Sequence, residues 1–132
     1  MDNNYLLTDI KITKTISSLE SNGFEVWFVS NHLEAEQLFW KEIFNKVNPN
    51  TVSLGDSLTL HSTGIIPRLK ETHGVELIET FGEHLSWREQ IHNRKRALSC
   101  DMFLTGTNAV TIKGQLVNLD MIGNRVAGIA FG

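Results

Sequence analysis

Polar side chains and glycines are concentrated between Thr105 and Arg125, and this stretch carries the richest set of ligand-binding groups in the sequence. The groups belong to Thr105, Thr107, Asn108, Asn118, Asp120, Asn124 and Arg125, with Gly106 and Gly123 between them. Glycine lets backbone N–H groups approach a ligand closely, and asparagine offers both a hydrogen-bond donor and an acceptor. We interpret the stretch as a polar ligand site. The alternative is that its residues only form turns and helix caps.

Two short segments could hold an anion. Gly123 and Asn124 stand where a helix is predicted to begin, and a helix N-terminus offers free N–H groups to a phosphate or carboxylate. The other segment is Gly55-Asp56-Ser57, in which Ser57 and the nearby Thr59 could donate hydroxyl hydrogen bonds. It could equally be an ordinary strand-to-helix cap. It lacks the lysine of a P-loop and the three glycines of a dinucleotide-binding turn.

No residue is assigned a catalytic role from the sequence, and no metal ligands are predicted. The five histidines are scattered, without a helical pair at metal spacing. Cys100 precedes an apolar run and is predicted to be a small core residue. The basic residues from Arg88 to Arg96 are predicted to form a solvated helix face. The alternative is that one arginine turns inward to meet an anion.

Composition narrows the class of protein. The chain has 132 residues, of which 41% are hydrophobic, and a net charge of −3. These values predict one globular domain and argue against a nucleic-acid partner. A single cysteine excludes a disulfide framework, and it excludes an iron–sulfur or zinc site built from several thiolates of this chain. The polar N-terminus and the lack of a long apolar segment predict a cytoplasmic protein without a membrane contact.

Hydrophobic periodicity and cap signals predict an alternation of helices and strands. Helices are expected at 3–21, 32–47, 64–73, 86–99 and 125–131, and strands at 24–29, 51–54, 75–80 and 102–105. Segments 109–112 and 115–119 are predicted to form a hairpin closed by Lys113-Gly114. The alternation predicts an α/β fold with a mostly parallel sheet flanked by helices. Ligands of such sheets bind outside the carboxyl ends of the strands.

Three segments between Met102 and Ala127 resemble the signature of the LUD domain. The segments are Met102-Phe103-Leu104-Thr105-Gly106-Thr107-Asn108-Ala109-Val110-Thr111, Gly114-Gln115-Leu116-Val117-Asn118-Leu119-Asp120 and Ile122-Gly123-Asn124-Arg125-Val126-Ala127. This is the family of lactate utilization proteins, whose members resemble an accessory component of bacterial lactate oxidation. The resemblance extends more weakly over nearly the whole chain, including residues 52–55, Ser57, Thr59 and residues 62–64.

The resemblance implies a NagB/RpiA/CoA transferase-like fold, shared with ribose-phosphate isomerase, glucosamine-phosphate deaminase and the CoA transferases. In that fold the ligand lies over glycine-bearing strand ends, so the loops at Gly55 and Gly106 would face each other. The implied function is an accessory or ligand-binding component of L-lactate oxidation to pyruvate. The implied partners are a small anionic metabolite and oxidoreductase subunits. Cofactors are expected only as iron–sulfur clusters in those partner subunits, with none in this chain.

Two alternatives to an accessory role stay open. One is an enzyme of the same superfold, an isomerase, CoA transferase or cycloligase that acts on a small anionic metabolite. Against it, Thr107-Asn108-Ala109 has neither the nucleophilic glutamate of a CoA transferase nor the acidic pair of a sugar-phosphate isomerase. The other alternative is an inactive truncated domain.

Two features depart from the family pattern. Asp56 stands where relatives usually have a second glycine, and its carboxylate would repel a phosphate unless a cation lies beside it. The chain also ends at Gly132, where relatives continue with a strand and a helix. We therefore expect an N-terminal portion or a truncated member, a single domain over residues 1–132. Its uncovered sheet edge would favour homo-oligomers.

Overall fold

The computed structural model describes the backbone of residues 3–132 and the side chains of residues 7–132. The chain forms two compact units. The first, the helix–hairpin unit, contains the described residues up to 29 together with 107–119. The second, the sheet unit, contains residues 30–106 and 120–132.

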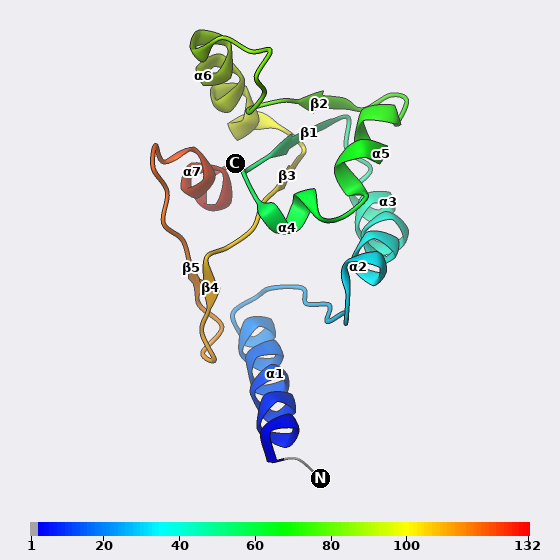
Figure 1. Ribbon diagram of the computed structural model, residues 1–132, viewed down its shortest axis with the longest axis vertical. Helices are drawn as coiled ribbons and strands as arrows, with labels where there is room; N and C mark the ends of the chain where they lie inside the picture. The colour runs from blue at the N-terminus through cyan, green and yellow to red at the C-terminus, as the bar shows by residue number, and fades with distance from the viewer. Residues whose placement is uncertain (1–2) are drawn as a thin grey trace. The chain divides into compact units, whose positions relative to one another are not determined.

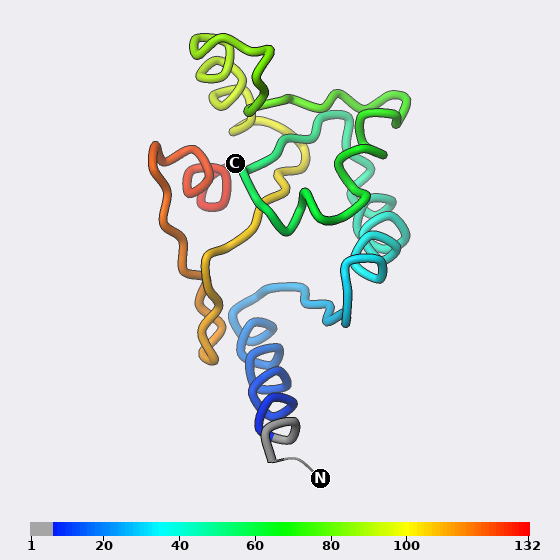
Figure 2. Tube along the Cα trace, in the orientation of Figure 1, coloured from blue at the N-terminus to red at the C-terminus, as the bar shows by residue number. Residues whose placement is uncertain are grey.

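Three parallel strands form the centre of the sheet unit. They are β1 (Thr51–Leu54), β2 (Glu76–Ile78) and β3 (Met102–Leu104), and β1 lies between the other two (Figure 1). Val52 of β1 pairs with Leu77 and with Met102. Helical segments separate each strand from the next along the chain, as the trace in Figure 2 shows. The predicted α/β class with a parallel sheet is confirmed.

One face of this sheet carries the hydrophobic core. The helices over it are α2 (His32–Leu38), the π-helical segment η1 (Phe39–Phe44), α3 (Asn45–Val47) and α5 (Ile65–Glu71). The buried core residues are Phe39, Trp40, Val52, Ile65, Leu69 and Met102. Side chains alternate between the faces of a strand, so Val52 and its register partners Leu77 and Met102 point to the same side. Burial of this face is the main source of stability.

The opposite face is covered by segments from the end of the chain. They are α6 (Trp87–Arg96), the 3₁₀ turn η2 (Ala97–Ser99) and α7 (Asn124–Ala130). Gly128 of α7 packs so closely on β3 that an added Cβ would lie 2.7 Å from a ring carbon of Phe103. Ala97 is buried, and η2 contacts both β1 and α7. Helices therefore cover both faces of the sheet, as predicted.

The helix–hairpin unit combines α1 (Asn3–Ser21) with strands β4 (Ala109–Val110) and β5 (Leu116–Val117). The two strands are antiparallel, and Gly114 in their turn has a φ of 72°, which favours glycine. The Asn22 side chain donates to the carbonyl oxygens of Lys113 and Gly114, at 3.0 and 2.9 Å. The predicted helix and hairpin are both confirmed.

The strand predicted over residues 24–29 is wrong. This segment is irregular, and Phe28, Phe24 and Trp27 are 61%, 45% and 38% exposed. An apolar run becomes a buried strand only when other strands pair with it and helices cover it. No strand among the described residues pairs with the segment. The sheet of the described chain therefore has three parallel strands, not the expected four.

Most other elements lie close to their predicted positions. The helix expected over 64–73 is α5, the one over 86–99 is α6 with η2, and the one from Arg125 is α7. The helix predicted over 32–47 is one helical run in which the π-helical segment stands between α2 and α3. A further helix, α4 (Leu58–His61), was not predicted. Ser57 begins it, because its hydroxyl accepts a hydrogen bond from the Leu60 N–H at 3.3 Å.

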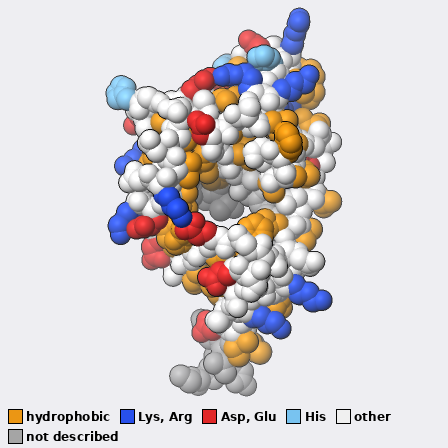
Figure 3. Space-filling view, turned by 180° about the vertical axis from the view of Figure 1, so that it is seen from behind, with side chains coloured by type: hydrophobic (Ala, Val, Ile, Leu, Met, Phe, Trp, Pro, Cys, Tyr) orange, Lys and Arg blue, Asp and Glu red, His pale blue; other side chains and the backbone are white. Residues whose placement is uncertain are grey.

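Hydrophobic side chains also reach the surface. In the face seen in Figure 3 they are scattered among charged and polar side chains. Leu58, Met121 and Phe131 are each at least 85% exposed. None of the described helices is both long enough and apolar enough to cross a membrane.

Candidate functional site at the carboxyl edge of the sheet

The three parallel strands end at one edge, and short hydrogen bonds join the segments that leave them. The Gly55 N–H donates to the carbonyl oxygen of Leu104 at 2.8 Å. The Thr80 hydroxyl donates to the carbonyl oxygen of Leu54 at 2.7 Å. Thr80 is almost completely buried, with 2% of its surface exposed. The loops after β1, β2 and β3 are therefore held together at the edge where α/β folds bind ligands.

The loops after β1 and β3 approach each other through two glycines. A Cβ on Gly55 would lie 2.8 Å from the Cβ of Thr105 and in contact with its hydroxyl oxygen. A Cβ on Gly106 would lie 2.6 Å from the hydroxyl oxygen of Ser57. Arg125 of α7 also reaches this place, with its Cγ 3.4 Å from the same Gly55 position. The structure thus brings together five of the residues singled out from the sequence.

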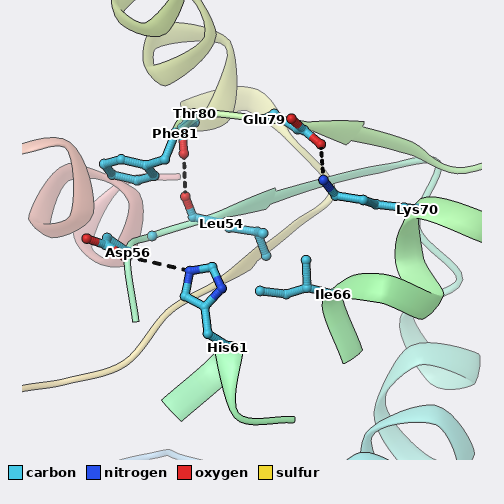
Figure 4. A pocket seen from close by; sticks show the side chains of 9 residues that line it. Leu54, Asp56, His61, Ile66, Lys70, Glu79, Thr80 and Phe81 are labelled. Carbon is cyan, nitrogen blue, oxygen red and sulfur yellow. Dashed lines mark hydrogen bonds and ion pairs between the residues drawn. The ribbon is translucent and has the colours of Figure 1, made fainter. Parts of the chain in front are cut away.

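A hollow of about 80 Å³ lies beside these loops, between the ends of β1 and β2 (Figure 4). Its lining comprises Leu54, Gly55, Asp56, His61, Ile66, Lys70, Glu79, Thr80 and Phe81. Leu54 and Ile66 give it an apolar wall. Asp56 and His61 face each other across 3.9 Å, with side chains 70% and 63% exposed. A pair so exposed to water contributes little stability, and it carries a salt bridge only when His61 is protonated.

A shorter ion pair lies on the other side of the hollow. The Lys70 ammonium is 2.6 Å from Glu79, and the other carboxylate oxygen of Glu79 is 3.4 Å from His84. The site predicted from the sequence did not include Lys70, Glu79, Thr80 or Phe81. A signal existed for Glu79 and Thr80, because they end a predicted strand as Thr105 does. Lys70 comes from α5, and no spacing in the sequence indicates where its ammonium group lies.

The N-terminus of α7 is occupied by a carboxylate of the chain itself. Asp120 Oδ2 accepts hydrogen bonds from the N–H groups of Arg125 at 2.7 Å and Val126 at 3.0 Å. Burial alone would raise the pKa of Asp120, but the backbone hydrogen bonds outweigh it and hold the pKa below its ordinary value. Gly123 precedes the helix with a φ of 83°. This end of α7 is therefore capped internally, and the proposed anion position is filled by Asp120.

Three other selected residues belong to the helix–hairpin unit. The Thr107 hydroxyl donates to the carbonyl oxygen of Val117 at 3.0 Å, and Asn108 Oδ1 accepts from the Leu119 N–H at 2.9 Å. Asn118 has a buried Oδ1 that accepts no hydrogen bond from the described residues. Thr107 and Asn108 thus form hydrogen bonds across the hairpin.

The remaining selected residues lie on helices of the sheet unit. Thr59 is exposed on α4, and its carbonyl oxygen accepts from the Ser62 hydroxyl at 2.8 Å. Asn124 is the first residue of α7 and lines a groove between α6 and α7.

Cys100 has the features of a structural thiol. It is partly buried, and its Sγ lies 3.2 Å from the carbonyl oxygen of Met102. Burial raises the pKa of the Cys100 thiol, which disfavours the nucleophilic thiolate. In the part of the chain that the structure describes, no group of three or more His, Cys, Asp or Glu side chains could hold a metal ion.

Comparison with known protein families gives one match. The sequence model of the LUD domain matches residues 12–132, which is nearly the whole chain. Searches of the curated proteins and of the solved structures gave no match.

Proposed function

The chain belongs to the LUD domain family, and from that premise we propose that it is an accessory, ligand-binding component of lactate utilization. In this proposal it holds a small anionic metabolite at the carboxyl edge of the sheet and docks to oxidoreductase subunits that carry iron–sulfur clusters. The observation that supports ligand binding most directly is the close approach of the β1 and β3 loops. It depends on Gly55 and Gly106, because a Cβ on Gly55 would overlap Thr105 and a Cβ on Gly106 would overlap Ser57.

The chemistry of this edge favours holding a ligand over attacking one. Ser57 and Thr105 place hydroxyl groups beside these glycines, whereas the Gly55 N–H already donates to Leu104. Asp56 opposes an anion electrostatically, whereas a protonated His61 at 3.9 Å would offset it. Lys70 is paired with Glu79 and adds no net charge. The proposed ligand is therefore small and carries few charges, as a hydroxy acid or keto acid does.

A thermal-shift panel tests the ligand. It contains lactate, pyruvate, sugar phosphates, CoA esters and nucleotides, each added to the folded chain. A ligand present at 100 times its dissociation constant stabilises the folded state by about 2.7 kcal/mol. We expect the largest shift from lactate or pyruvate. A folded protein that none of these compounds stabilises would contradict the proposal.

The variant Asp56→Asn locates the ligand. It removes the negative charge beside the loop while it keeps the size of the side chain, so we expect tighter binding of the same anion. Asp9→Asn is the control, because Asp9 lies on α1 in the helix–hairpin unit. Equal affinities of the two variants would place the ligand elsewhere.

Genes for iron–sulfur proteins and a lactate permease beside the gene for this chain would support the role in lactate utilization.

A further inference from the structure

Arg94 of α6 is a buried cation without a counterion among the described residues. Only 8% of its surface is exposed, although it lies in a run of basic residues. Its Nη2 donates to the side-chain oxygen of Gln90 at 3.1 Å, while Nε and Nη1 are buried without a hydrogen-bond partner in the part of the chain that the structure describes. No carboxylate of the described residues forms an ion pair with it.

Aromatic rings hold the guanidinium group in place. Its central carbon lies 4.7 Å from the ring centroid of Phe81 and 5.3 Å from that of Trp87. Gln90 fixes the group further, because its amide donates to the carbonyl oxygens of Gly82 and Leu85. Cation–π contacts lower the cost of burying a charge, but they supply no acceptor for the two free nitrogens. A buried charge that keeps unsatisfied donors is costly, and an anion would relieve that cost.

A groove of about 250 Å³ lies beside Arg94, between α6 and α7. Its lining is Ile91, Arg94, Lys95, Leu98, Ile122, Gly123, Asn124 and Ala127. Two of these side chains are cationic, none is acidic, and most of the others are aliphatic. The nearby carboxylate of Asp120 accepts hydrogen bonds from backbone N–H groups of α7. The groove therefore combines positive charge with apolar walls.

We propose that this groove is a second binding site, which takes the carboxylate of a small organic acid. The carboxylate accepts hydrogen bonds from Arg94, and Lys95 adds attraction from the rim. The hydrocarbon part of the acid packs on Ile91, Leu98 and Ile122. Arginine suits this role because its planar donors match a carboxylate and its charge is permanent. The site shares no lining residue with the hollow at the carboxyl edge.

Titration calorimetry with three probes tests the proposal on the full chain. Isovalerate has a carboxylate and a branched hydrocarbon, isovaleramide has the same shape without charge, and inorganic phosphate has charge without hydrocarbon. We expect isovalerate to bind at least about tenfold more tightly than either of the others. Equal affinity for the amide would overturn the role of charge. Equal affinity for phosphate would show that the hydrocarbon part contributes nothing, and it would overturn the proposal that the ligand is an organic acid.

The variant Arg94→Met tests the anchor. Methionine keeps much of the volume and removes the buried charge, so the ligand-free protein should unfold at an equal or higher temperature while isovalerate binding weakens at least about tenfold. Arg88→Met is the matched control, because Arg88 is exposed on the same helix. Unchanged affinity in the Arg94 variant, or equal losses in both variants, would overturn the proposal.

Arg94→Lys covers the case in which Arg94→Met does not fold. It keeps the charge and loses the planar arrangement of donors. We therefore expect this variant to bind isovalerate more weakly than the wild type does, but more tightly than the wild type binds isovaleramide. Wild-type affinity for isovalerate in this variant would count against Arg94 as the anchor.

Discussion

Asp120 Oδ2 lies 2.7 Å from the backbone nitrogen of Arg125, the second residue of α7. The same oxygen accepts from Val126 at 3.0 Å. A carboxylate is the group that the partial positive charge of a helix N-terminus attracts. The chain supplies this group itself, five residues before Arg125. A residue selected as a ligand contact from the sequence therefore acts as a helix cap.

Replacing Asp120 should destabilise the sheet unit. We expect Asp120→Ala to lower the free energy of unfolding by about 0.5–2 kcal/mol, the usual cost of losing a cap. Urea denaturation at neutral pH measures the change. Asp9→Ala is the control on α1, and an Asp120 variant no less stable than this control would show that the cap contributes nothing.

The same carboxylate should make stability depend on pH. The pKa of Asp120 is lower in the folded chain than its unfolded value of about 3.9. Its contribution is therefore complete above the unfolded pKa and is lost as the pH falls through the folded pKa. The wild type should lose stability in acid faster than Asp120→Asn. Parallel acid titrations of the two proteins would contradict this assignment.

Asp101 should stabilise the start of β1. Its Oδ2 accepts from the N–H groups of Thr51 and Asn50 at 2.8 and 2.9 Å, and hydrogen bonds from Thr51 are the main reason that the pKa of Asp101 is lowered. This stabilisation is present above the unfolded pKa and is lost as the pH falls through the folded one. In Asp101→Asn we expect faster hydrogen exchange at the Thr51 amide near neutral pH. Exchange at the β3 amides serves as the internal control, and unchanged exchange at Thr51 would refute the prediction.

A side chain at position 128 should lower the stability of the protein as long as Phe103 is present. A Cβ there would lie 2.7 Å from the Phe103 ring, so Gly128→Ala should destabilise by about 1–3 kcal/mol despite the higher helix propensity of alanine. Phe103→Leu removes the ring and should make the added methyl group less costly. A double-mutant cycle by urea denaturation measures this coupling. Additive free energies would mean that α7 moves away from β3 without cost.

Gly106 should be needed for the close approach of the β1 and β3 loops. Its Cβ position lies 2.6 Å from the Ser57 hydroxyl oxygen, so we expect Gly106→Ala to destabilise by about 1–3 kcal/mol. Ser57→Ala removes that oxygen and should recover part of the loss in the double variant. Thermal denaturation of the four proteins gives the comparison. If Ser57→Ala recovers none of the stability, the overlap is not the cause.

Local signals explain the elements that were predicted well. Ser86 and Glu89 form a capping box at the start of α6, with both reciprocal hydrogen bonds present. β1 spans the predicted residues, and the hairpin turns at Gly114 as expected. Each of these signals depends on residues only a few positions apart. The strand predicted over residues 24–29 was wrong because the prediction used only the apolar composition of the run. Burial of a strand depends on partners far along the chain.

For the candidate site, the sequence by itself determined that the loops beginning at Gly55 and Thr105 leave parallel strands. The tertiary structure decided what surrounds them. Lys70 meets Glu79 across the hollow, and Arg94 is buried while Arg88 on the same helix is exposed. The reason is that caps and turns are local, whereas the partner of a charge and its burial depend on how helices pack on the sheet.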